Sequence, residues 1–489
     1  MQLTDFLNGL RVLSVTGEVQ RKDVSSIWYD SRKVQANSVF VAIKGESSDG
    51  HKYITEAISR GAIAVIVEDA NAIPDEIYLH SKTAKIVVAN SRHALAEGAH
   101  HLYKNPSEKL ALTGVTGTNG KTTVTYILKT IFEKAGKKTG LIGTIETYNG
   151  SKTVQSQLTT PESSDLSMML FEMNTNGCSS AVMEVSSHAL AMERVSALHF
   201  RCAVFTNLSQ DHLDYHGDME SYFQAKKKLF DLLHESDIAV YNTDDEFGES
   251  IVEDTRARRI SYGRNPEADY RIDSVNCSLT GTAFELSHGN DTFQLATGLK
   301  GEFNAYNAAA AFAAAHQQGV KPEDIIAALK EVPQVPGRFE VYTGSGKTVI
   351  VDYAHTPDSL EKTLKNIHEI APGSSIYTVF GCGGNRDKGK RPLMGAIASE
   401  LSRQVILTND NPRLEDPDAI ISDIAKGINT NNYKIIQDRR EAIRDAIGNA
   451  PDGSIILVAG KGHEATQTVG KEKFHFSDTE EVKKALGNG

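Results

Sequence analysis

The sequence has few of the features that mark secreted, membrane-spanning or nucleic-acid-binding proteins. It contains four cysteines, at positions 178, 202, 277 and 382, and none belongs to a CxxC pair, so we expect reduced, partly buried thiols. No apolar run is long enough to cross a bilayer, and the first residues have no apolar segment of the signal-peptide type. The net charge of −11 argues against a broad basic surface. We therefore expect a cytoplasmic protein that neither inserts into a membrane nor binds nucleic acid.

The length of 489 residues is too great for a single hydrophobic core, since domains usually have about 100–200 residues. Residues 1–98 alternate short apolar runs with Gly- and Asp-rich turns, which favours a small α/β domain. Residues 99–333 begin with a strand-like run at 110–115 and continue as alternating strands and helices, which favours a parallel-rich sheet. Residues 334–489 contain four apolar runs, each followed by a polar or Gly-rich motif, as in a Rossmann-like α/β domain. The sequence therefore predicts an α/β protein of three domains.

The clearest chemical signal is the segment GTNGKTT at 117–123, which lies between a strand-like run and a helical pattern. In such a turn, backbone N–H groups and the helix N-terminus face an anion, Lys121 reaches the outer phosphates and Thr122 can hold Mg²⁺. The strict pattern G-x-x-x-x-G-K-[ST] fails by one place, because Val115 stands where its first glycine would be. The segment is a variant P-loop, and it predicts that the central domain binds ATP.

Three further motifs of the central block carry ionisable side chains. Glu184 ends a strand-like run, and a carboxylate near a P-loop commonly holds Mg²⁺, although a capping role is the simpler interpretation of this motif alone. His212 lies beside Asp211 in a dense polar run, which makes it a candidate metal ligand. Lys226 belongs to the run AKKK, for which the residues alone favour a solvated basic face of a helix.

The third block places charges of both signs where parallel strands end, at DYAHTPD, GCGGNRDKGKRP, TNDNPR and AGKGHE. Ligands of parallel α/β sheets bind beyond the carboxyl ends of the strands. Carboxylates suit an ammonium group and arginines suit carboxylates, so this rim favours a zwitterionic amino acid. Surface ion pairs at loop tips are the simpler alternative, and the presence of four motifs on one rim weakens it. The candidate residues are Arg386, Asp410, Asn411, Arg413, Gly460 and Glu464.

Eleven motifs, in order along essentially the whole chain, resemble those of the Mur ligase family of peptidoglycan synthesis. They are DSR at 30–32, GTNGKTT, TTPE at 159–162, EVSSHAL, NLSQDHLDYHG, the pair Asn304 and Asn307, PGRFE, DYAHTPDSL, GCGGNRDKGKRP, DNPR and AGKGHE. The resemblance is greatest to the members that add the third residue to a UDP-N-acetylmuramoyl dipeptide. One departure is Met192, where some relatives have a glutamine that contacts substrate.

The resemblance implies roles for the matching positions. ATP would be held by Gly117, Thr118, Asn119, Gly120, Lys121, Thr122 and Thr123, with Asn304 near the adenine and Arg338 nearby. Catalysis would depend on Lys121, Glu184, His212 and Lys226, and the Mg²⁺ ligands would be Thr122, Glu184, His212 and Lys226 carried as a carbamate. The UDP-muramoyl dipeptide would contact Ser31, Thr159, Thr160, Ser186 and Arg194, which makes the first domain a nucleotide-sugar domain. The incoming amino acid would contact Arg386, Asp410, Asn411, Pro412, Arg413, Gly460 and Glu464.

The function implied by the resemblance is an ATP- and Mg²⁺-dependent amide ligase, expected to be a monomer. It would join meso-diaminopimelate to the D-glutamate of UDP-N-acetylmuramoyl-L-alanyl-D-glutamate through an acyl phosphate. The motif DNPR resembles the diaminopimelate version, in which Arg413 binds the distal carboxylate. Lysine-adding members lack that arginine, because an arginine that faces no anion would be an unpaired charge.

Four other interpretations remain open at this point. A folylpolyglutamate synthetase shares the P-loop and ligase plan, but it needs neither DNPR nor a domain for a uridine nucleotide. A lysine-adding relative is disfavoured by Arg413. In a nucleotide switch or motor ATPase, the charged rim of the third block would be accidental. A non-catalytic binder of muramoyl peptides would have no need of Lys121, Glu184 and Lys226.

Overall fold

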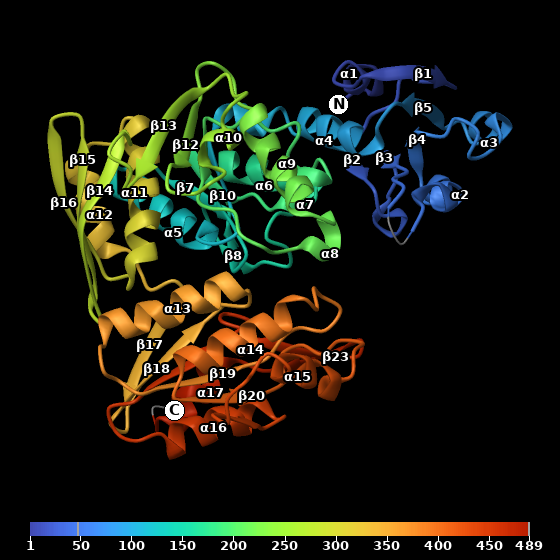
Figure 1. Cartoon of the computed structure of the whole chain (residues 1–489). Coiled ribbons are helices and arrows are strands. Elements are labelled where there is room, and N and C mark those ends of the chain that lie inside the picture. The colour runs from blue at the N-terminus through green and yellow to red at the C-terminus, as the bar shows by residue number, and fades with distance from the viewer. Residues whose placement is uncertain (46–47, 488–489) are drawn as a thin grey trace.

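The computed structural model describes residues 1–45 and 48–487, which form three large β-sheets with flanking helices and one two-stranded hairpin (Figure 1). The first sheet has the strand order β1-β5-β4-β3-β2, with only β1 antiparallel. Its strands are β1 (Val12–Thr16), β2 (Ser26–Trp28), β3 (Ser38–Val41), β4 (Ala62–Val67) and β5 (Ala84–Val88). Its helices are α1 (Leu3–Leu7), α2 (Ile54–Ser59), α3 (Asp75–His80) and α4 (Ser91–Leu102), with short 3-10 turns at Ser31–Lys33 and Gly50–Tyr53. Strands β3 to β5 are apolar on both faces, because helices cover the sheet from both sides.

The central sheet has the strand order β16-β15-β14-β13-β12-β11-β6-β10-β7-β8-β9. Strands β6, β7 and β10 to β14 are parallel, whereas β8, β9, β15 and β16 are antiparallel. The strands are β6 (Ala111–Thr116), β7 (Thr139–Ile142), β8 (Glu146–Tyr148), β9 (Thr153–Gln155), β10 (Ser180–Glu184), β11 (Cys202–Phe205), β12 (Ile238–Asn242), β13 (Arg258–Gly263), β14 (Tyr270–Ser278), β15 (Gly281–His288) and β16 (Asp291–Thr297). A 3-10 turn at Pro106–Lys109 leads from α4 into β6.

Helices cover both faces of this sheet and bury two hydrophobic clusters. One face carries α5 (Lys121–Lys134), α11 (Glu302–Gln317) and α12 (Pro322–Glu331). The alanine-rich α11 packs against α5, because its short side chains allow the two helices to approach closely. The other face carries α6 (Ser163–Thr175) and α9 (Met219–Asp231), with the short helices α7 (Ser187–Ala191), α8 (Leu213–His216) and α10 (Gly248–Ile251) nearby.

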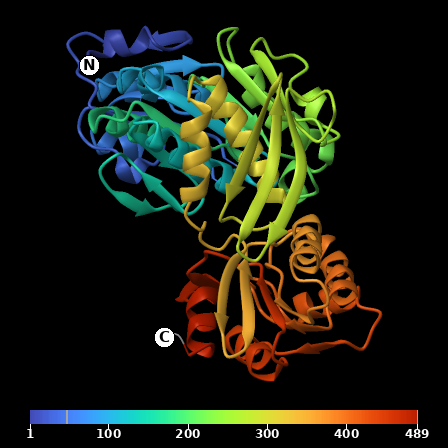
Figure 2. The ribbon, with the colours of Figure 1, turned by 90° about the vertical axis from the view of Figure 1, so that its left-hand side faces the viewer.

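The third sheet has the order β17-β18-β22-β19-β20-β21 and is parallel except for β17. Its strands are β17 (Glu340–Gly344), β18 (Lys347–Asp352), β19 (Ile376–Phe380), β20 (Gln404–Leu407), β21 (Tyr433–Ile435) and β22 (Ile455–Ala459). Its helices are α13 (Pro357–Ile370), α14 (Lys390–Leu401), α15 (Pro417–Ala425), α16 (Arg439–Asn449) and α17 (Asp478–Ala485), and β23 (Thr466–Val469) with β24 (Glu472–His475) forms a separate hairpin. This lobe lies below the central one in both views (Figure 2).

The predicted three-part α/β organisation is confirmed, including the parallel-rich central sheet and the Rossmann-like third sheet. The sequence interpretation missed the long antiparallel extension β14–β16, whose outer strands carry many polar residues. Helix α4 runs through residue 98, so the first predicted boundary falls inside a helix. None of the helices in the described residues combines the length and apolar character that a membrane crossing requires.

Candidate active site

The loop between β6 and α5 contains two positions whose backbone conformation and close neighbours allow only glycine. Gly117 has a φ of 149°, and a Cβ atom there would lie 1.9 Å from Thr206 Oγ1. Gly120 has a φ of 87°, and a Cβ atom there would lie 2.5 Å from Asn307 Oδ1. Both positions require the left-handed or extended positive-φ backbone that side chains oppose. The loop therefore has the glycine-dependent shape of a P-loop, with Val115 in place of the first glycine, and its binding of phosphate stays a prediction.

The segment after β11 holds this loop in shape. The Thr118 N–H donates to Asn207 O at 2.8 Å and the Asn119 N–H donates to Asn207 Oδ1 at 3.0 Å. Thr206 Oγ1 donates to Asn119 O at 2.6 Å. Thr206 and Asn207 were not singled out from the sequence, although they begin the polar run that contains His212. Their contacts explain why that run begins where a parallel strand next to β6 ends.

The Lys121 ammonium lies inside the turn of the loop. Its Nζ donates to Gly117 O at 2.8 Å and to Thr118 O at 2.9 Å. Burial lowers the Lys121 pKa, while the carboxylates of Glu184 and Asp211 oppose that shift. The ammonium is thus held by carbonyls and nearby carboxylates rather than by bulk water, which suits a cation that binds phosphate.

Glu184 ends β10 and is 1% exposed, so its carboxylate needs internal partners. It accepts hydrogen bonds from Thr122 Oγ1 at 3.0 Å, from the Thr144 N–H at 2.7 Å and from Thr144 Oγ1 at 2.9 Å. Arg338 Nη2 donates to Thr122 Oγ1 at 3.1 Å, and its guanidinium lies 4.4 Å from the centroid of the Tyr353 ring. A carboxylate and a threonine hydroxyl in contact supply the hard oxygen ligands that Mg²⁺ prefers.

Lys226 lies on α9 and is 1% exposed, so its interpretation as a solvated basic face is wrong. Its Nζ donates to Gly117 O at 2.8 Å and lies 4.5 Å from the centroid of the Tyr222 ring. Burial lowers the Lys226 pKa well below its usual value, and the Lys121 charge adds to that effect. The run AKKK misled the residue-based interpretation because, of its three lysines, only Lys228 is exposed, whereas Lys226 and Lys227 are buried.

His212 directly precedes α8 with a φ of 55°, and its ring lies edge-on to that of His188, with centroids 4.8 Å apart. Burial lowers the His212 pKa to about 3, although the Asp211 carboxylate opposes that shift, so the imidazole is neutral at physiological pH. Its Nε2 lies 3.5 Å from Asp211 Oδ2, and His355 Nε2 of the third lobe lies 3.7 Å from the same oxygen. A neutral imidazole is the form that can bind a metal ion.

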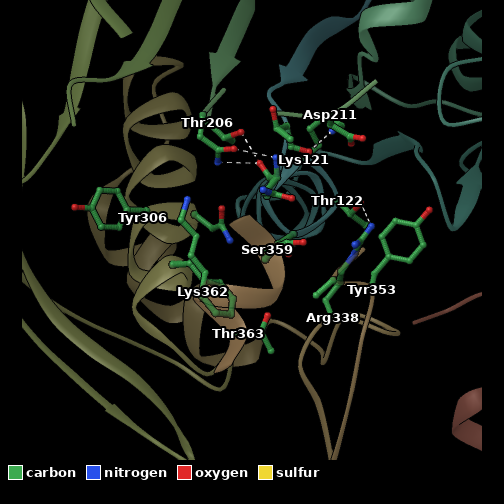
Figure 3. A pocket seen from close by; sticks show the side chains of 18 of the residues that line it. Lys121, Thr122, Thr206, Asp211, Tyr306, Arg338, Tyr353, Ser359, Lys362 and Thr363 are labelled. Carbon is green, nitrogen blue, oxygen red and sulfur yellow. Dashed lines mark hydrogen bonds between the residues drawn. The ribbon is translucent and has the colours of Figure 1, made fainter. Parts of the chain in front are cut away.

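A cavity of about 600 Å³ opens between the central and C-terminal lobes. Figure 3 shows Lys121, Thr122 and Thr206 on one side and Arg338 with Tyr353 on another, and α13 contributes Ser359, Lys362 and Thr363. Glu184, His212 and Lys226 also line this space.

The predicted adenine contact Asn304 is buried and is not among the residues that line this cavity. Its Nδ2 donates to Lys300 O and its Oδ1 accepts from Asn307 Nδ2, each at 2.9 Å. The α11 residues that line the space are Glu302, Phe303, Tyr306 and Asn307.

The four motifs of the third lobe meet at one edge of its sheet, as predicted. The Gly384 N–H donates to Asn411 O at 2.9 Å, and Asn411 Nδ2 donates to Glu464 Oε2 at 2.8 Å. Gly460 has a φ of 114°, and a Cβ atom there would lie 2.9 Å from Asp410 Oδ2. The sequence interpretation overlooked Lys461, which is fully buried and donates to Asn411 Oδ1 at 3.3 Å and to Glu464 Oε2 at 2.9 Å.

Arg413 is half-buried at this edge, directly after the buried Pro412. Its Nη1 donates to Gly384 O at 2.8 Å. Burial and the charge of Arg386 lower the Arg413 pKa, whereas Asp410 and Glu464 oppose the shift. Two guanidiniums and two carboxylates therefore share one small region, which is complementary to a ligand with charges of both signs.

Family models match the three lobes in turn. A Mur ligase family catalytic domain covers residues 23–103, a Mur ligase middle domain covers 115–315 and a glutamate ligase domain of Mur ligases covers 337–462. A UDP-N-acetylmuramoyl-L-alanyl-D-glutamate–2,6-diaminopimelate ligase of Clostridium botulinum is 42% identical over 95% of this chain and 96% of its own length. The chain belongs to the Mur ligase family.

Other Mur ligases agree with this assignment. The diaminopimelate ligase of Aquifex aeolicus is 44% identical over 95% of this chain and 94% of its own length. A solved structure of a ligase with the same name has a TM-score of 0.70 at 31% identity and covers 99% of this chain and 98% of that one. The MurF structure from Acinetobacter baumannii has a TM-score of 0.69 at 20% identity, over 94% of this chain and 95% of that one, which shows a shared fold.

In this Mur ligase, most of the residues expected to contact the UDP-muramoyl dipeptide surround Glu184. Thr144 Oγ1 lies 3.1 Å from Thr159 Oγ1, and Thr160 Oγ1 donates to Glu184 O at 2.8 Å. Arg194 Nη1 donates to Thr160 O at 3.0 Å, and its Nε lies 2.7 Å from Glu162 Oε1. Ser186 is the N-cap of α7, where its Oγ accepts from the Ala189 N–H at 3.3 Å.

Ser31 is the one predicted dipeptide contact from the first lobe. Its Oγ donates to Glu56 Oε2 at 2.9 Å. Two residues earlier in the chain, the Tyr29 pKa is raised to about 12 by burial and by the charge of Glu162, with Arg194 opposing. Tyr29 therefore lies within electrostatic reach of Glu162 and Arg194 of the central lobe, and contact of Ser31 with the dipeptide stays a prediction.

Proposed function

We propose that this Mur ligase joins meso-diaminopimelate to the D-glutamate of UDP-N-acetylmuramoyl-L-alanyl-D-glutamate, with hydrolysis of ATP to ADP and phosphate. One observation carries the proposal: a phosphate cradle with buried Glu184 and Lys226 faces a lobe whose strand ends hold two arginines and two carboxylates. The names of the most similar relatives support the same reaction.

The two halves of the site face each other. Burial lowers the His188 pKa, and the charges of Arg194 and Arg386 add to that shift, so the amino-acid rim lies within electrostatic reach of the metal-ligand region. Gln210 Nε2 of the central lobe also donates to Asp387 Oδ2, next to Arg386, at 3.3 Å. We infer that an amino acid on the rim can reach a carboxylate that is activated beside the P-loop.

The donor set beside the P-loop fits Mg²⁺. Thr122 and Glu184 supply oxygen atoms in mutual contact, and the neutral His212 faces the same cavity. Lys226 would join them as a carbamate, because its lowered pKa favours the neutral amine that reacts with CO₂. When bound, Mg²⁺ neutralises charge on the phosphates during transfer.

The chain's own residues position the reactants for two steps. The dipeptide's γ-carboxylate attacks the ATP γ-phosphorus, ADP leaves, and Lys121 and Arg338 offset negative charge beside the loop. The amine of diaminopimelate then attacks the acyl phosphate carbonyl, the amide C–N bond forms, the amine loses a proton and phosphate leaves. Closure of the lobes over the cavity would bring the amine to the carbonyl and exclude water.

The third lobe would recognise both ends of diaminopimelate. Arg413, held by Gly384 O, would bind the distal carboxylate, and Asp410 with Glu464 would accept from the distal ammonium. Arg386 would approach the other carboxylate. A lysine substrate would leave Arg413 without an anion, at the cost of an unpaired half-buried charge.

We also propose the division 1–98, 99–333 and 334–489, in which the first domain holds the UDP moiety, the second ATP and the third the amino acid. Each of these ranges contains one of the three large sheets. In this proposal the enzyme works as a monomer in the cytoplasm, where its soluble precursor is available.

The test is release of ADP in reactions that lack one component at a time. With ATP, Mg²⁺, UDP-N-acetylmuramoyl-L-alanyl-D-glutamate and diaminopimelate present, ADP and a tripeptide product of matching mass should form in equal amounts. Omission of either the dipeptide or the amino acid should stop release, and so should Lys121→Ala. ADP release that ignores both acceptors would instead indicate an ATPase of another kind.

A further inference from the structure

A second group of metal-ligating side chains lies away from the proposed active site. His199, His234 and Asp237 are, within residues 1–45 and 48–487, the one group of three such side chains whose ligand atoms all lie within 4.8 Å of one another. His199 shortly precedes β11 and Asp237 directly precedes β12, so the group lies at the amino ends of these strands. The P-loop and Glu184 follow the carboxyl ends of neighbouring parallel strands, at the opposite edge of the same sheet.

We propose that His199, His234 and Asp237 form a binding site for a first-row transition-metal ion of the Zn²⁺ class. Two imidazoles and one carboxylate are a donor set that Zn²⁺ uses in proteins, with a water molecule in the fourth position. Mg²⁺ prefers oxygen ligands, so the site would not take the metal of the ligase reaction.

The distances fit such an ion. Ligand atoms about 2.0–2.1 Å from a tetrahedral metal lie about 3.3 Å from one another. Here His199 Nε2 is 3.1 Å and His234 Nδ1 is 3.8 Å from Asp237 Oδ2, and the three ligand atoms all lie within 4.8 Å of one another, so the His234 ring would turn inward to complete the site. The two imidazole rings lie side by side, with centroids 4.6 Å apart.

The Asp237 carboxylate is fixed in place, whereas the His234 side chain is free to change its orientation. The Asp237 side chain has no exposed surface, and its Oδ2 also accepts from the His234 N–H at 2.8 Å. The His234 side chain is 68% exposed, so it can turn toward an incoming ion. Arg201 Nη1 lies 3.8 Å from Asp237 Oδ1 and competes for the carboxylate, but its side chain is 45% exposed and can move into solvent.

Metal binding here would tie together two segments of the central lobe. His234 follows α9, the helix that carries Lys226. His199 precedes β11, and Thr206 at the other end of β11 donates a hydrogen bond to Asn119 O of the P-loop. The His199 N–H also donates to Ser107 Oγ at 2.9 Å, in the segment that leads out of the first lobe. The ion would stabilise the folded lobe without contacting the reactants, so its effect should appear in stability rather than in chemistry.

The experiment measures Zn²⁺ binding to the full chain after removal of metals, by calorimetric titration and by thermal unfolding. His234→Ala removes one ligand with little packing cost, and His475→Ala is a matched control. The His475 side chain is also 68% exposed and also pairs with a carboxylate, that of Glu480, at 2.9 Å. The wild type and His475→Ala should bind one more Zn²⁺ per chain than His234→Ala, and Zn²⁺ should raise their melting temperatures more.

Asp237→Asn keeps the shape of the carboxylate and should also lose this Zn²⁺, provided that the variant retains its circular dichroism spectrum. The ligase reaction with Mg²⁺ should run at the wild-type rate in His234→Ala. Equal Zn²⁺ stoichiometry and equal stabilisation in wild type and His234→Ala would overturn the proposal.

Discussion

Replacement of Arg413 by methionine should separate diaminopimelate from lysine as substrates. The variant keeps most of the apolar stem and removes the guanidinium, whose Nη1 donates to Gly384 O at 2.8 Å. In the proposed complex the guanidinium pairs with the distal carboxylate in a half-buried setting, near Arg386, Asp410 and Glu464. Removal of one partner of such a pair costs about 2–5 kcal/mol, because the other charge stays buried and unpaired. The two remaining carboxylates add repulsion, so the upper half of this range is expected.

At about 1.4 kcal/mol per factor of ten, about 3.5–5 kcal/mol corresponds to a loss of kcat/KM for diaminopimelate of roughly three orders of magnitude. Arg413→Lys keeps a charge but loses the planar fork, so its loss should be intermediate. The assay is ADP release at saturating ATP and dipeptide, with diaminopimelate and lysine each varied, and the melting temperature of each variant serves as a folding control. Lysine has no distal carboxylate, so Arg413→Met should leave its kcat/KM unchanged or higher. An equal loss for both amino acids, or no loss for diaminopimelate, would refute the assignment.

Three further outcomes follow from the site. Gly117→Ala should abolish ATP binding, measured by fluorescent-nucleotide titration, because the new Cβ atom would lie 1.9 Å from Thr206 Oγ1. The control is Gly136→Ala, which should bind ATP normally, because Gly136 also has a positive φ, of 77°, but no atom lies within 4 Å of its Cβ position. Removal of CO₂ should slow ligation and its return should restore the rate, and Lys226→Ala should be inactive in both conditions. A wild-type ligation rate that does not depend on CO₂ would exclude the carbamate. Burial lowers the His100 pKa to about 4, so the unfolded chain takes up a proton below about pH 6.5 that the folded chain takes up only near pH 4, and up to about 3 kcal/mol of stability is lost as the pH falls through that window. In urea unfolding experiments, His100→Gln should therefore lose less of its free energy of unfolding between pH 7 and 4.5 than the wild type does. An unchanged dependence of that free energy on pH would contradict the shift.

The shape of the P-loop could be predicted because it depends on residues that are neighbours in the sequence. A strand, a glycine-rich turn and a lysine at the start of a helix create the phosphate cradle wherever they occur. The same holds for the C-terminal rim, since the carboxyl ends of parallel strands must share one edge of their sheet. These features are local, and the sequence therefore predicts them well.

Features that depend on how distant segments pack were not predictable in this way. The residues around Lys226 read as a solvated helix face, yet α9 lies beneath the P-loop and buries that side chain against Gly117 and Tyr222. Contacts between lobes, such as that of Asn119 Nδ2 with Asp358 Oδ2 at 3.1 Å, depend on lobe orientation, which no short motif encodes. Lys461 escaped notice because a lysine between two glycines resembles an exposed loop cation.

The central claim is that the phosphate cradle activates a muramoyl-dipeptide carboxylate for amide bond formation with diaminopimelate. The most direct measurement is ADP release with UDP-N-acetylmuramoyl-L-alanyl-D-glutamate, in which meso-diaminopimelate and lysine are compared and the products are weighed by mass spectrometry. We expect one ADP per tripeptide and a kcat/KM for diaminopimelate at least about a hundredfold above that for lysine, as expected from the paired Arg413 charge. A preference for lysine, or ADP release without a tripeptide product, would contradict the account.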